Sequence, residues 1–396
     1  MKIAIVNNQA FTLWQFRRGL IRRLMEDGHD VLLITPAGPQ SQSYIEQLRG
    51  LGARHVALAL DQYVDPTGDV RFLFELTKLL RTERIDLVHN ITIKANILGT
   101  IAAKLAGVRR VVGLVPGLGH VYVDRPGIRA WLVRNVATLL YGIIFRLNYR
   151  VWLQNEDNLE FLVRARLLPR KKAVLIRGSG VDLTEYSPEC VDPKRLEALR
   201  EELGITDGRP LVLMAARAHW RKGVREFFTA AELVGREMPA LFALAGAAEG
   251  TVGVARPEDL EAQESKHFRW LGFRSDVREL IALSDVVTLP SFYPEGVPRS
   301  LLEALAIGKP IVTTDSVGCR ETVDDGVNGF LVPPQNAGAL AAAIATLLRD
   351  ADLRRRFGAR SREKAKREFD ERLVVDRVLK EVYGLPLPAL PGKSAA

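Results

Sequence analysis

Two glutamates, Glu295 and Glu303, lie in the segment Ser291–Pro310, which follows an apolar run, Val286–Pro290, typical of a buried strand. A carboxylate accepts hydrogen bonds at both oxygens, so it suits the vicinal hydroxyls of a ribose or another sugar. In parallel sheets, ligands bind beyond the carboxyl ends of the strands. The two side chains are therefore candidates for holding a hydroxylated ligand, although glutamates at this spacing also occur by chance on solvated surfaces.

The same segment predicts a helix whose start binds an anion. Pro298 favours the first helical turn, and Gly308 favours a C-terminal stop. Backbone N–H groups at the start of a helix attract negative charge. Those of Gly296 and Val297 are therefore predicted to face a phosphate or another anion.

Two cations, Arg217 and Lys222, follow a second apolar run, Leu211–Ala216. Fixed cations at such a place neutralise the charge of a diphosphate leaving group. A basic residue after a strand is more often simply solvated, so the interpretation depends on the surrounding pattern. That pattern is arginine, four residues, lysine and glycine.

Both segments resemble signatures of glycosyltransferase family 4, retaining enzymes of the two-domain GT-B type. The first resembles the Glu-x7-Glu signature, and the second resembles the Arg-x4-Lys-Gly pattern. The resemblance implies that Arg217 and Lys222 hold the diphosphate of a nucleotide sugar and are catalytic together with Glu295, which contacts the donor sugar. Glu303 would bind the ribose. The remaining donor-binding residues that it implies are Phe273, Gly296 and Val297.

Further matches to this family span most of the chain. In the second half they are Gly178–Asp182, Leu271–Asp276, Thr314–Glu321 and Gly326–Pro333. In the first half, His89–Ala95 and Gly117–His120 resemble members that extend lipid-linked sugars. Many relatives carry a histidine where Pro116-Gly117 stands here, and His120 comes slightly later. A structural or solvated His120 is thus as plausible as one that contacts the acceptor.

Short apolar runs alternate with helical stretches, which predicts two successive α/β halves with parallel sheets covered on both faces. The predicted strands are Lys2–Val6, Val31–Thr35, Ile85–His89, Arg110–Val115, Arg150–Leu153, Ala173–Arg177, Leu211–Ala216, Ala240–Ala245, Phe268–Leu271, Val286–Pro290 and Pro310–Thr314. The expected fold is α/β of the GT-B type, with two Rossmann-like domains facing across a cleft. The expected divisions are residues 1–178 for the acceptor side, 179–368 for the nucleotide sugar, 369–384 for a helix returning to the first domain, and 385–396 for a flexible tail.

The net charge of +9 is unevenly distributed. Residues 1–178 hold 26 basic and 14 acidic side chains, whereas residues 179–396 hold 30 and 33. A basic half indicates an anionic partner such as a membrane surface, a phosphorylated substrate or nucleic acid, unless it is simply solvated. No motif supports nucleic-acid binding.

The segment 127–150 combines apolar residues with arginines and almost no acids, which suits a helix lying at a membrane surface; a buried core helix is the alternative. Its longest apolar run is too short to span a bilayer. The N-terminal residues 1–6 read as a strand rather than a signal peptide. The candidates for contacts with the acceptor or the membrane are Arg17, Lys94, His120, Trp131 and Arg134.

The sequence lacks the motifs that mark P-loop nucleotide binding and metal sites. The chain has no phosphate-binding Gly-x4-Gly-Lys-Ser/Thr loop, and its two cysteines show no metal-ligand spacing. Its Asp-x-Asp motif, Asp350–Asp352, lies between helical stretches, with Asp352 as a predicted helix cap. We therefore expect no metal and no cofactor, because the two cations near the donor can take the place of a metal.

The resulting hypothesis is a cytoplasmic, peripherally membrane-associated retaining glycosyltransferase. It would move a sugar from a nucleoside diphosphate donor, by resemblance UDP, to a polyprenyl-diphosphate-linked sugar. The alternatives are a UDP-sugar epimerase of similar architecture and a non-catalytic subunit of a polysaccharide assembly complex.

Overall fold

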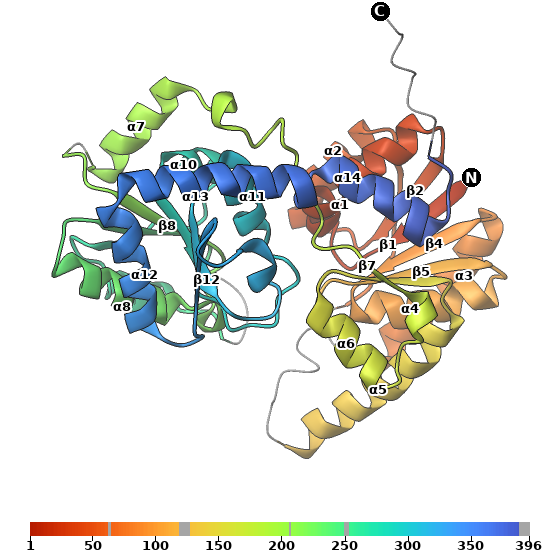
Figure 1. Cartoon of the computed structure of the whole chain (residues 1–396). Coiled ribbons are helices and arrows are strands. Elements are labelled where there is room, and N and C mark those ends of the chain that lie inside the picture. The colour runs from red at the N-terminus through yellow and green to blue at the C-terminus, as the bar shows by residue number, and fades with distance from the viewer. Residues whose placement is uncertain (62–64, 119–126, 206, 249–252, 388–396) are drawn as a thin grey trace, which may run out of the picture. The chain divides into compact units, whose positions relative to one another are not determined.

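The computed structural model describes residues 1–61, 65–118, 127–205, 207–248 and 253–387, and it divides into two compact α/β units (Figure 1). Unit 1 comprises Met1–Gly180 together with Glu371–Ala396, and unit 2 comprises Val181–Asp370. The chain thus crosses between units within two residues of 178 and 368, the expected divisions. The prediction of parallel α/β architecture is confirmed in both units.

Unit 1 contains a seven-stranded parallel sheet of order β3-β2-β1-β4-β5-β6-β7. The strands are β1 (Lys2–Val6), β2 (Asp30–Thr35), β3 (Arg54–Ala57), β4 (Leu87–Ile91), β5 (Arg110–Val115), β6 (Arg150–Leu153) and β7 (Ala173–Leu175). The helices are α1 (Ala10–Glu26), η1 (Pro39–Ser41), α2 (Gln42–Gly50), α3 (Pro66–Thr82), α4 (Ile93–Leu105), α5 (Ile128–Leu147), α6 (Glu156–Arg164), η3 (Arg170–Lys172), α14 (Glu371–Arg377) and the π-helical η8 (Val378–Tyr383).

Unit 2 contains a six-stranded parallel sheet of order β10-β9-β8-β11-β12-β13. The strands are β8 (Leu211–Ala215), β9 (Leu241–Ala245), β10 (Phe268–Trp270), β11 (Val286–Leu289), β12 (Ile311–Thr314) and β13 (Gly329–Val332). The helices are η4 (Pro188–Cys190), α7 (Pro193–Leu203), η5 (Trp220–Lys222), α8 (Val224–Gly235), α9 (Pro257–Glu261), α10 (Val277–Leu283), α11 (Arg299–Ile307), η6 (Arg320–Thr322), α12 (Ala337–Arg349), α13 (Ala351–Lys364) and the π-helical η7 (Ala365–Phe369).

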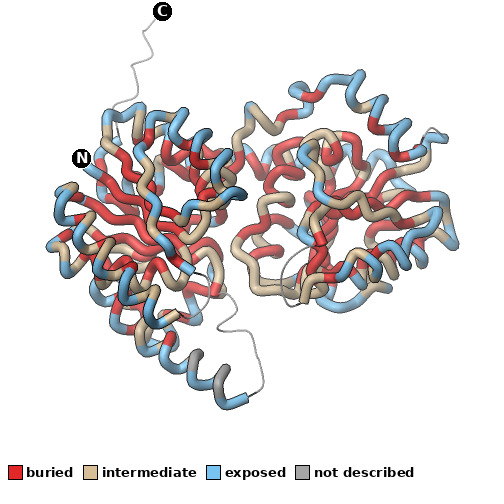
Figure 2. The backbone as a smooth tube through the Cα atoms, turned by 180° about the vertical axis from the view of Figure 1, so that it is seen from behind, coloured by how far each residue is buried: buried red, intermediate tan, exposed pale blue. Residues whose placement is uncertain are grey.

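The central strands are buried on both faces, as Figure 2 shows by their colour. In β1, Ile3 and Ile5 pack with α1, α2 and the C-terminal helices, whereas Ala4 and Val6 pack with α3 and α4. Side chains alternate between the two faces of a strand. A continuous apolar run therefore places one core on each side of the sheet, as in other parallel sheets.

The departures from the predicted elements have local causes. Strands β3 and β13 lie at sheet edges and were not predicted. Strand β3 is partly exposed and has no apolar run, whereas β13 has one, residues 330–332, that was not recognised as a strand. The predicted strand Ile85–His89 starts two residues too early because the Ile85 N–H still bonds to the end of α3. Helix α11 begins at Arg299, one residue after Pro298. Asp350, rather than Asp352, caps α13 by accepting the Leu353 N–H at 2.8 Å.

The C-terminal segment of the chain packs on unit 1. The segment α14–η8 contributes apolar side chains to the same core as α1, and Arg23 bonds to Asp376 at 2.7 Å. Deeper in this core, the Tyr383 hydroxyl lies 2.7 Å from His89 Nδ1, and both residues are fully buried. The histidine of the His89–Ala95 segment therefore anchors the C-terminal helix of unit 1.

Burial of His89 leads to a testable pH dependence. Burial, with a smaller effect of the Arg17 charge, lowers the pKa of His89 to about 3. The unfolded chain binds a proton there below pH ~6.5, while the folded chain does not until about pH 3, so acid favours the unfolded state. The free energy of unfolding should therefore fall by about 1.4 kcal/mol per pH unit, through His89 alone, as the pH falls from 6 to 4.

The measurement is denaturant unfolding of the wild type and of His89→Gln, which keeps a neutral polar group opposite Tyr383, at pH 6, 5 and 4. Subtracting the two curves removes the contribution of all other titrating groups. We expect the wild type to lose stability more steeply than the variant. Parallel pH profiles would contradict the neutral, buried histidine.

Candidate active site

The predicted site residues of unit 2 lie where its strand order reverses. Strands β8 and β11 are neighbours at the centre of the sheet, although helices and two strands separate them along the chain. Arg217 and Lys222 follow β8, and Glu295 follows β11. In open α/β sheets the crevice at this switch point is the usual ligand site. The topology thus brings together residues that are 73 positions apart, Lys222 and Glu295.

Close contacts between glycines and backbone define how these loops pack. A Cβ on Gly223 would lie 2.1 Å from the Pro290 carbonyl oxygen, and one on Gly318 would lie 1.6 Å from that of Gly296. Both glycines also have a positive φ, 84° and 81°, a conformation that other residues adopt only with strain. The loops after β8, β11 and β12 are therefore in backbone contact.

Lys222 and Glu295 form an ion pair within this loop cluster. The Lys222 ammonium donates to Glu295 Oε1, and the two side chains are only 19% and 13% exposed. The Ser291 hydroxyl donates to the same carboxylate oxygen at 3.1 Å. A partly desolvated, charge-assisted contact of this kind holds both side chains in defined positions.

Arg217 differs from Lys222 in its surroundings. It is exposed, and its side chain forms no hydrogen bond or ion pair with a residue that the structure describes. The backbone N–H groups of Gly296 and Val297 also donate to no carbonyl or side chain among the described residues. The Arg217 side chain and these two N–H groups can therefore bind an anion without giving up a hydrogen bond to another described residue.

Glu303 is buried in the second turn of α11, where Arg299 Nε donates to its Oε1 at 2.9 Å. Both side chains are 10% exposed. No described residue bonds to Glu303 Oε2, so one carboxylate oxygen retains its capacity to accept from hydroxyl groups. Arg299 was not among the predicted site residues, although its i,i+4 spacing to Glu303 within a predicted helix was a readable signal.

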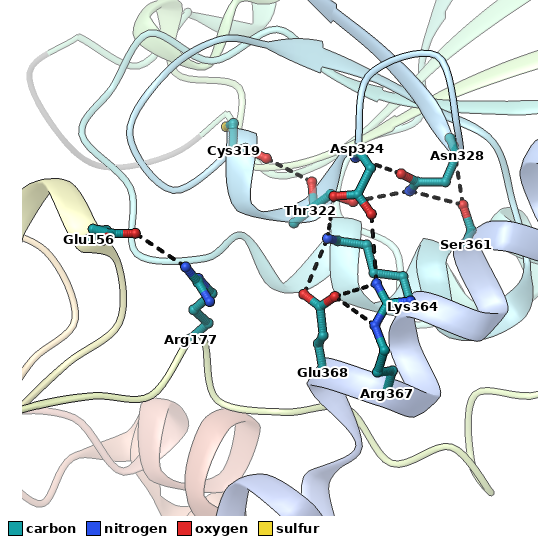
Figure 3. Close-up of polar contacts among 10 residues, drawn as sticks. All are labelled: Glu156, Arg177, Cys319, Thr322, Asp324, Asn328, Ser361, Lys364, Arg367 and Glu368. Atoms are coloured by element: carbon teal, nitrogen blue, oxygen red, sulfur yellow. Dashed lines mark hydrogen bonds and ion pairs between the residues drawn. The ribbon is translucent and has the colours of Figure 1, made fainter.

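The loop between β12 and β13, which carries Gly318, is held by a polar network that includes residues of α13 (Figure 3). Lys364 on α13 bonds to Asp324 at 2.8 Å, and the buried Asn328 donates to the Thr322 carbonyl at 3.1 Å. Next to Gly318, Cys319 is fully buried; burial, and secondarily the charge of Glu295, raises its pKa to about 11, so it stays a neutral thiol. This network ties the loop after β12 to α13.

Phe273 follows β10 and is 74% exposed. Next to it, Arg274 forms a bidentate pair with Asp276 at 2.8 and 2.7 Å and also bonds to Glu202. The loop is further fixed by a bond from the Gly246 N–H to the Gly272 carbonyl at 2.7 Å. A large aromatic ring is thus held on a rigid loop at the carboxyl end of the sheet.

The predicted acceptor-side residues that the structure describes lie on three helices of unit 1, α1, α4 and α5. Arg17 is 4% exposed and packs its guanidinium 4.7 Å from the centre of the Trp152 ring, so it is not on the surface. Lys94 pairs with Asp69 at 2.5 Å. Trp131 and Arg134 lie on α5, with Trp131 53% exposed. The prediction for His120 falls outside the described residues.

Comparison with known proteins decides the family. Residues 196–364 match the family described as Glycosyl transferases group 1, and residues 12–178 match the Glycosyl transferase 4-like domain. The N,N'-diacetylbacillosaminyl-diphospho-undecaprenol alpha-1,3-N-acetylgalactosaminyltransferase of Campylobacter jejuni is 33% identical over 381 residues, which cover 96% of this chain and 98% of the relative. The chain belongs to glycosyltransferase family 4.

A further sequence relative agrees with that family, and a solved structure agrees with the fold. The UDP-Gal:alpha-D-GlcNAc-diphosphoundecaprenol alpha-1,3-galactosyltransferase of Escherichia coli is 28% identical over 288 residues, 71% of each chain. HepE of Anabaena, whose crystal structure holds UDP and glucose, superimposes with a TM-score of 0.80 at 20% identity, covering 97% of this chain and all of that one. The predicted family and the GT-B fold class are confirmed.

Proposed function

We propose that this glycosyltransferase moves a hexose or N-acetylhexosamine from a nucleoside diphosphate sugar, with UDP as the nucleotide, to a polyprenyl-diphosphate-linked sugar with retention of configuration. The observation that carries the donor assignment is the Lys222–Glu295 pair beside an exposed Arg217 at the β8–β11 switch point. The activities for which the Campylobacter and Escherichia relatives are named support the class of acceptor.

In this proposal the donor diphosphate lies between Arg217 and Lys222, and Glu295 accepts a hydroxyl of the donor sugar. Negative charge grows on the diphosphate as the bond to the anomeric carbon breaks, and the two cations stabilise that charge. The leaving phosphate oxygen helps to take the proton from the acceptor hydroxyl on the same face of the sugar. Glu303 holds the ribose through its second carboxylate oxygen, and Phe273 meets the base.

The proposal assigns charge neutralisation to side chains and includes no metal ion. Transfer activity should therefore persist in excess EDTA at a rate within about twofold of the untreated enzyme, because Arg217 and Lys222 remain in place. The assay compares initial rates with EDTA, without it, and with added Mg²⁺ or Mn²⁺. A rate that falls to background and returns with one of these ions would contradict the metal-free assignment.

We further propose that α5 docks on the inner face of the cytoplasmic membrane, where a lipid-linked acceptor lies. One face of this 20-residue helix is buried through Tyr141, Ile144 and Phe145. Its other face carries large exposed apolar side chains, namely Ile128, Trp131, Leu132, Val136, Leu139, Ile143 and Leu147. An apolar stripe near arginines suits adsorption to an anionic surface. Among the described helices, none is long and apolar enough to cross a bilayer.

Membrane docking predicts the behaviour of a double variant, Trp131→Gln with Leu139→Gln. These side chains are 53% and 66% exposed, so the substitutions should spare folding. Burial of one large apolar side chain is worth ~1.5–3 kcal/mol, so the loss of two should lower vesicle affinity about 100-fold or more. The control is Val327→Gln, an exposed apolar residue of unit 2 at 48%.

The measurement is flotation with phosphatidylcholine vesicles, with and without phosphatidylglycerol. The wild type and the control should bind the anionic vesicles more tightly than the neutral ones, and the double variant should bind neither. Equal flotation of all three proteins would contradict the role of α5.

The donor assignment is tested by incubating the enzyme with a panel of nucleotide sugars in two arms. With a polyprenyl-diphosphate sugar present, one donor should be consumed and a longer lipid-linked glycan should form. With the donor alone, an epimerised nucleotide sugar would indicate an epimerase instead. Absence of nucleotide binding across the panel would favour a non-catalytic subunit.

A further inference from the structure

Ser291 occupies the first position after Pro290 at the carboxyl end of β11, and its side chain is fully buried. Its hydroxyl lies 3.1 Å from Glu295 Oε1 and 3.3 Å from the Arg221 carbonyl oxygen, and it accepts the Tyr293 N–H at 3.2 Å. A hydroxyl has one proton to donate. The charged carboxylate oxygen, the nearer acceptor, is the stronger partner for that proton.

The backbone of Ser291 is fixed as firmly as its side chain. Its carbonyl oxygen accepts bonds from the hydroxyls of Thr314 and Ser316, the latter at 2.7 Å. Thr314 is the last residue of the neighbouring strand β12, and Ser316 lies two residues beyond it. The backbone that carries the serine side chain is therefore held by contacts that involve neither Glu295 nor Lys222.

Lys222 and Ser291 both donate a hydrogen bond to Glu295 Oε1, but a bound nucleotide sugar affects the two bonds differently. A diphosphate competes with Glu295 for the Lys222 ammonium, since phosphate oxygens are strong acceptors for cations. The serine hydroxyl carries no charge and is fully buried, so it competes less than Lys222 for the diphosphate. When Lys222 turns to phosphate, the hydrogen bond from Ser291 is a contact that the carboxylate can keep.

We propose that Ser291 is a positioning residue that holds the Glu295 carboxylate toward the donor sugar after Lys222 has engaged the diphosphate. This inference rests on the proposed function, because it needs a nucleotide sugar in the site. It predicts a separation of effects: loss of the hydroxyl impairs use of the sugar while binding of the diphosphate nucleotide is spared.

The test uses Ser291→Ala in the full-length enzyme. A hydrogen bond to a charged group is worth about a 10- to 100-fold factor, so kcat/KM for the donor sugar should fall about 10-fold or more. The Kd for UDP alone, measured by calorimetry, should change less than twofold because Arg217 and Lys222 remain. A serine with only a structural role would weaken both quantities together.

The matched control is Ser284→Ala. Ser284 is 1% exposed, lies just before the other end of β11 and donates to the Ile281 carbonyl at 2.8 Å. Both serines are therefore buried and hydrogen-bonded near the same strand, but only Ser291 contacts a site residue. The Ser284 variant should keep kcat/KM and the Kd for UDP at wild-type values.

A double-mutant cycle asks whether Ser291 acts through Glu295. In a Glu295→Ala background, Ser291→Ala should lower the residual kcat/KM by less than twofold, because its acceptor is already gone. An equal loss in both backgrounds, or a parallel loss of UDP binding, would overturn the inference. A wild-type enzyme that neither binds UDP nor transfers sugar would overturn the proposed function and this inference together; an active wild type unaffected by Ser291→Ala would overturn the inference alone.

Discussion

Alanine in place of Arg217 or Lys222 is expected to lower kcat about 100- to 1,000-fold in each case, the usual cost of removing one fixed donor from a site of developing negative charge. Arg217 is exposed and unpaired among the described residues, whereas Lys222 is paired with Glu295. Both variants remove a positive charge from the loop after β8, and neither empties the hydrophobic core.

The two variants should differ in stability, which separates them mechanistically. Arg217→Ala should keep the wild-type Tm, because the side chain has no described partner to lose. Lys222→Ala should lower the Tm, because Glu295 is left 13% exposed without its lysine. Steady-state rates and thermal unfolding are measured on the same preparations. The control is Lys266→Ala, an exposed lysine of unit 2, which should be unchanged in both measurements. Near-wild-type rates for Arg217→Ala and Lys222→Ala would contradict the donor assignment.

Gly318→Ala is expected to damage both folding and catalysis. Its Cβ would lie 1.6 Å from the Gly296 carbonyl oxygen and 2.9 Å from that of Glu295, at a φ of 81°. The loop with Glu295 must then move. A displacement of about 1 Å at reacting groups costs roughly 100-fold in rate, and the strained backbone costs about 1–3 kcal/mol of stability.

Gly326→Ala provides the matched control for Gly318→Ala. Gly326 lies in the same β12–β13 connection and has a φ of 72°, but a Cβ there would meet nothing within 4 Å. It should lose about 1 kcal/mol of stability from backbone strain and keep its wild-type rate. The comparison separates strain from steric contact, using denaturant unfolding and donor kinetics. Equal activity of the two variants would contradict the packing of the β12 loop against Glu295.

The sequence was sufficient to predict the elements that bury a continuous apolar run. Central strands such as β1 and β5 were predicted with their observed bounds. The edge strand β3 was missed because its partly exposed residues show no apolar run, whereas β13 was missed although residues 330–332 are apolar. Glycine and proline placed the end of α11 correctly at Gly308 and its start to within one residue.

The charged residues of the candidate site could be predicted from the sequence, but the residues that hold them in position could not. Lys222 and Glu295 were chosen by their position after strands and by family resemblance, and the structure pairs them. Ser291 and Arg299 were missed because serine and arginine are common in any sequence. Their roles become visible only from their contacts with Glu295 and Glu303 in the folded chain. Arg17 was expected at a surface because arginine is usually exposed, but helix α1 buries it against Trp152.

The most direct test of a retaining glycosyltransferase is the stereochemistry of its product. The enzyme is incubated with an α-linked UDP sugar, the donor selected by the panel, and a polyprenyl-diphosphate-linked sugar, and the anomeric proton of the new linkage is assigned by NMR. The expected result is an α linkage, formed only when the acceptor is present and lost in Lys222→Ala. A β linkage, or consumption of the donor without a lengthened glycan, would contradict the account.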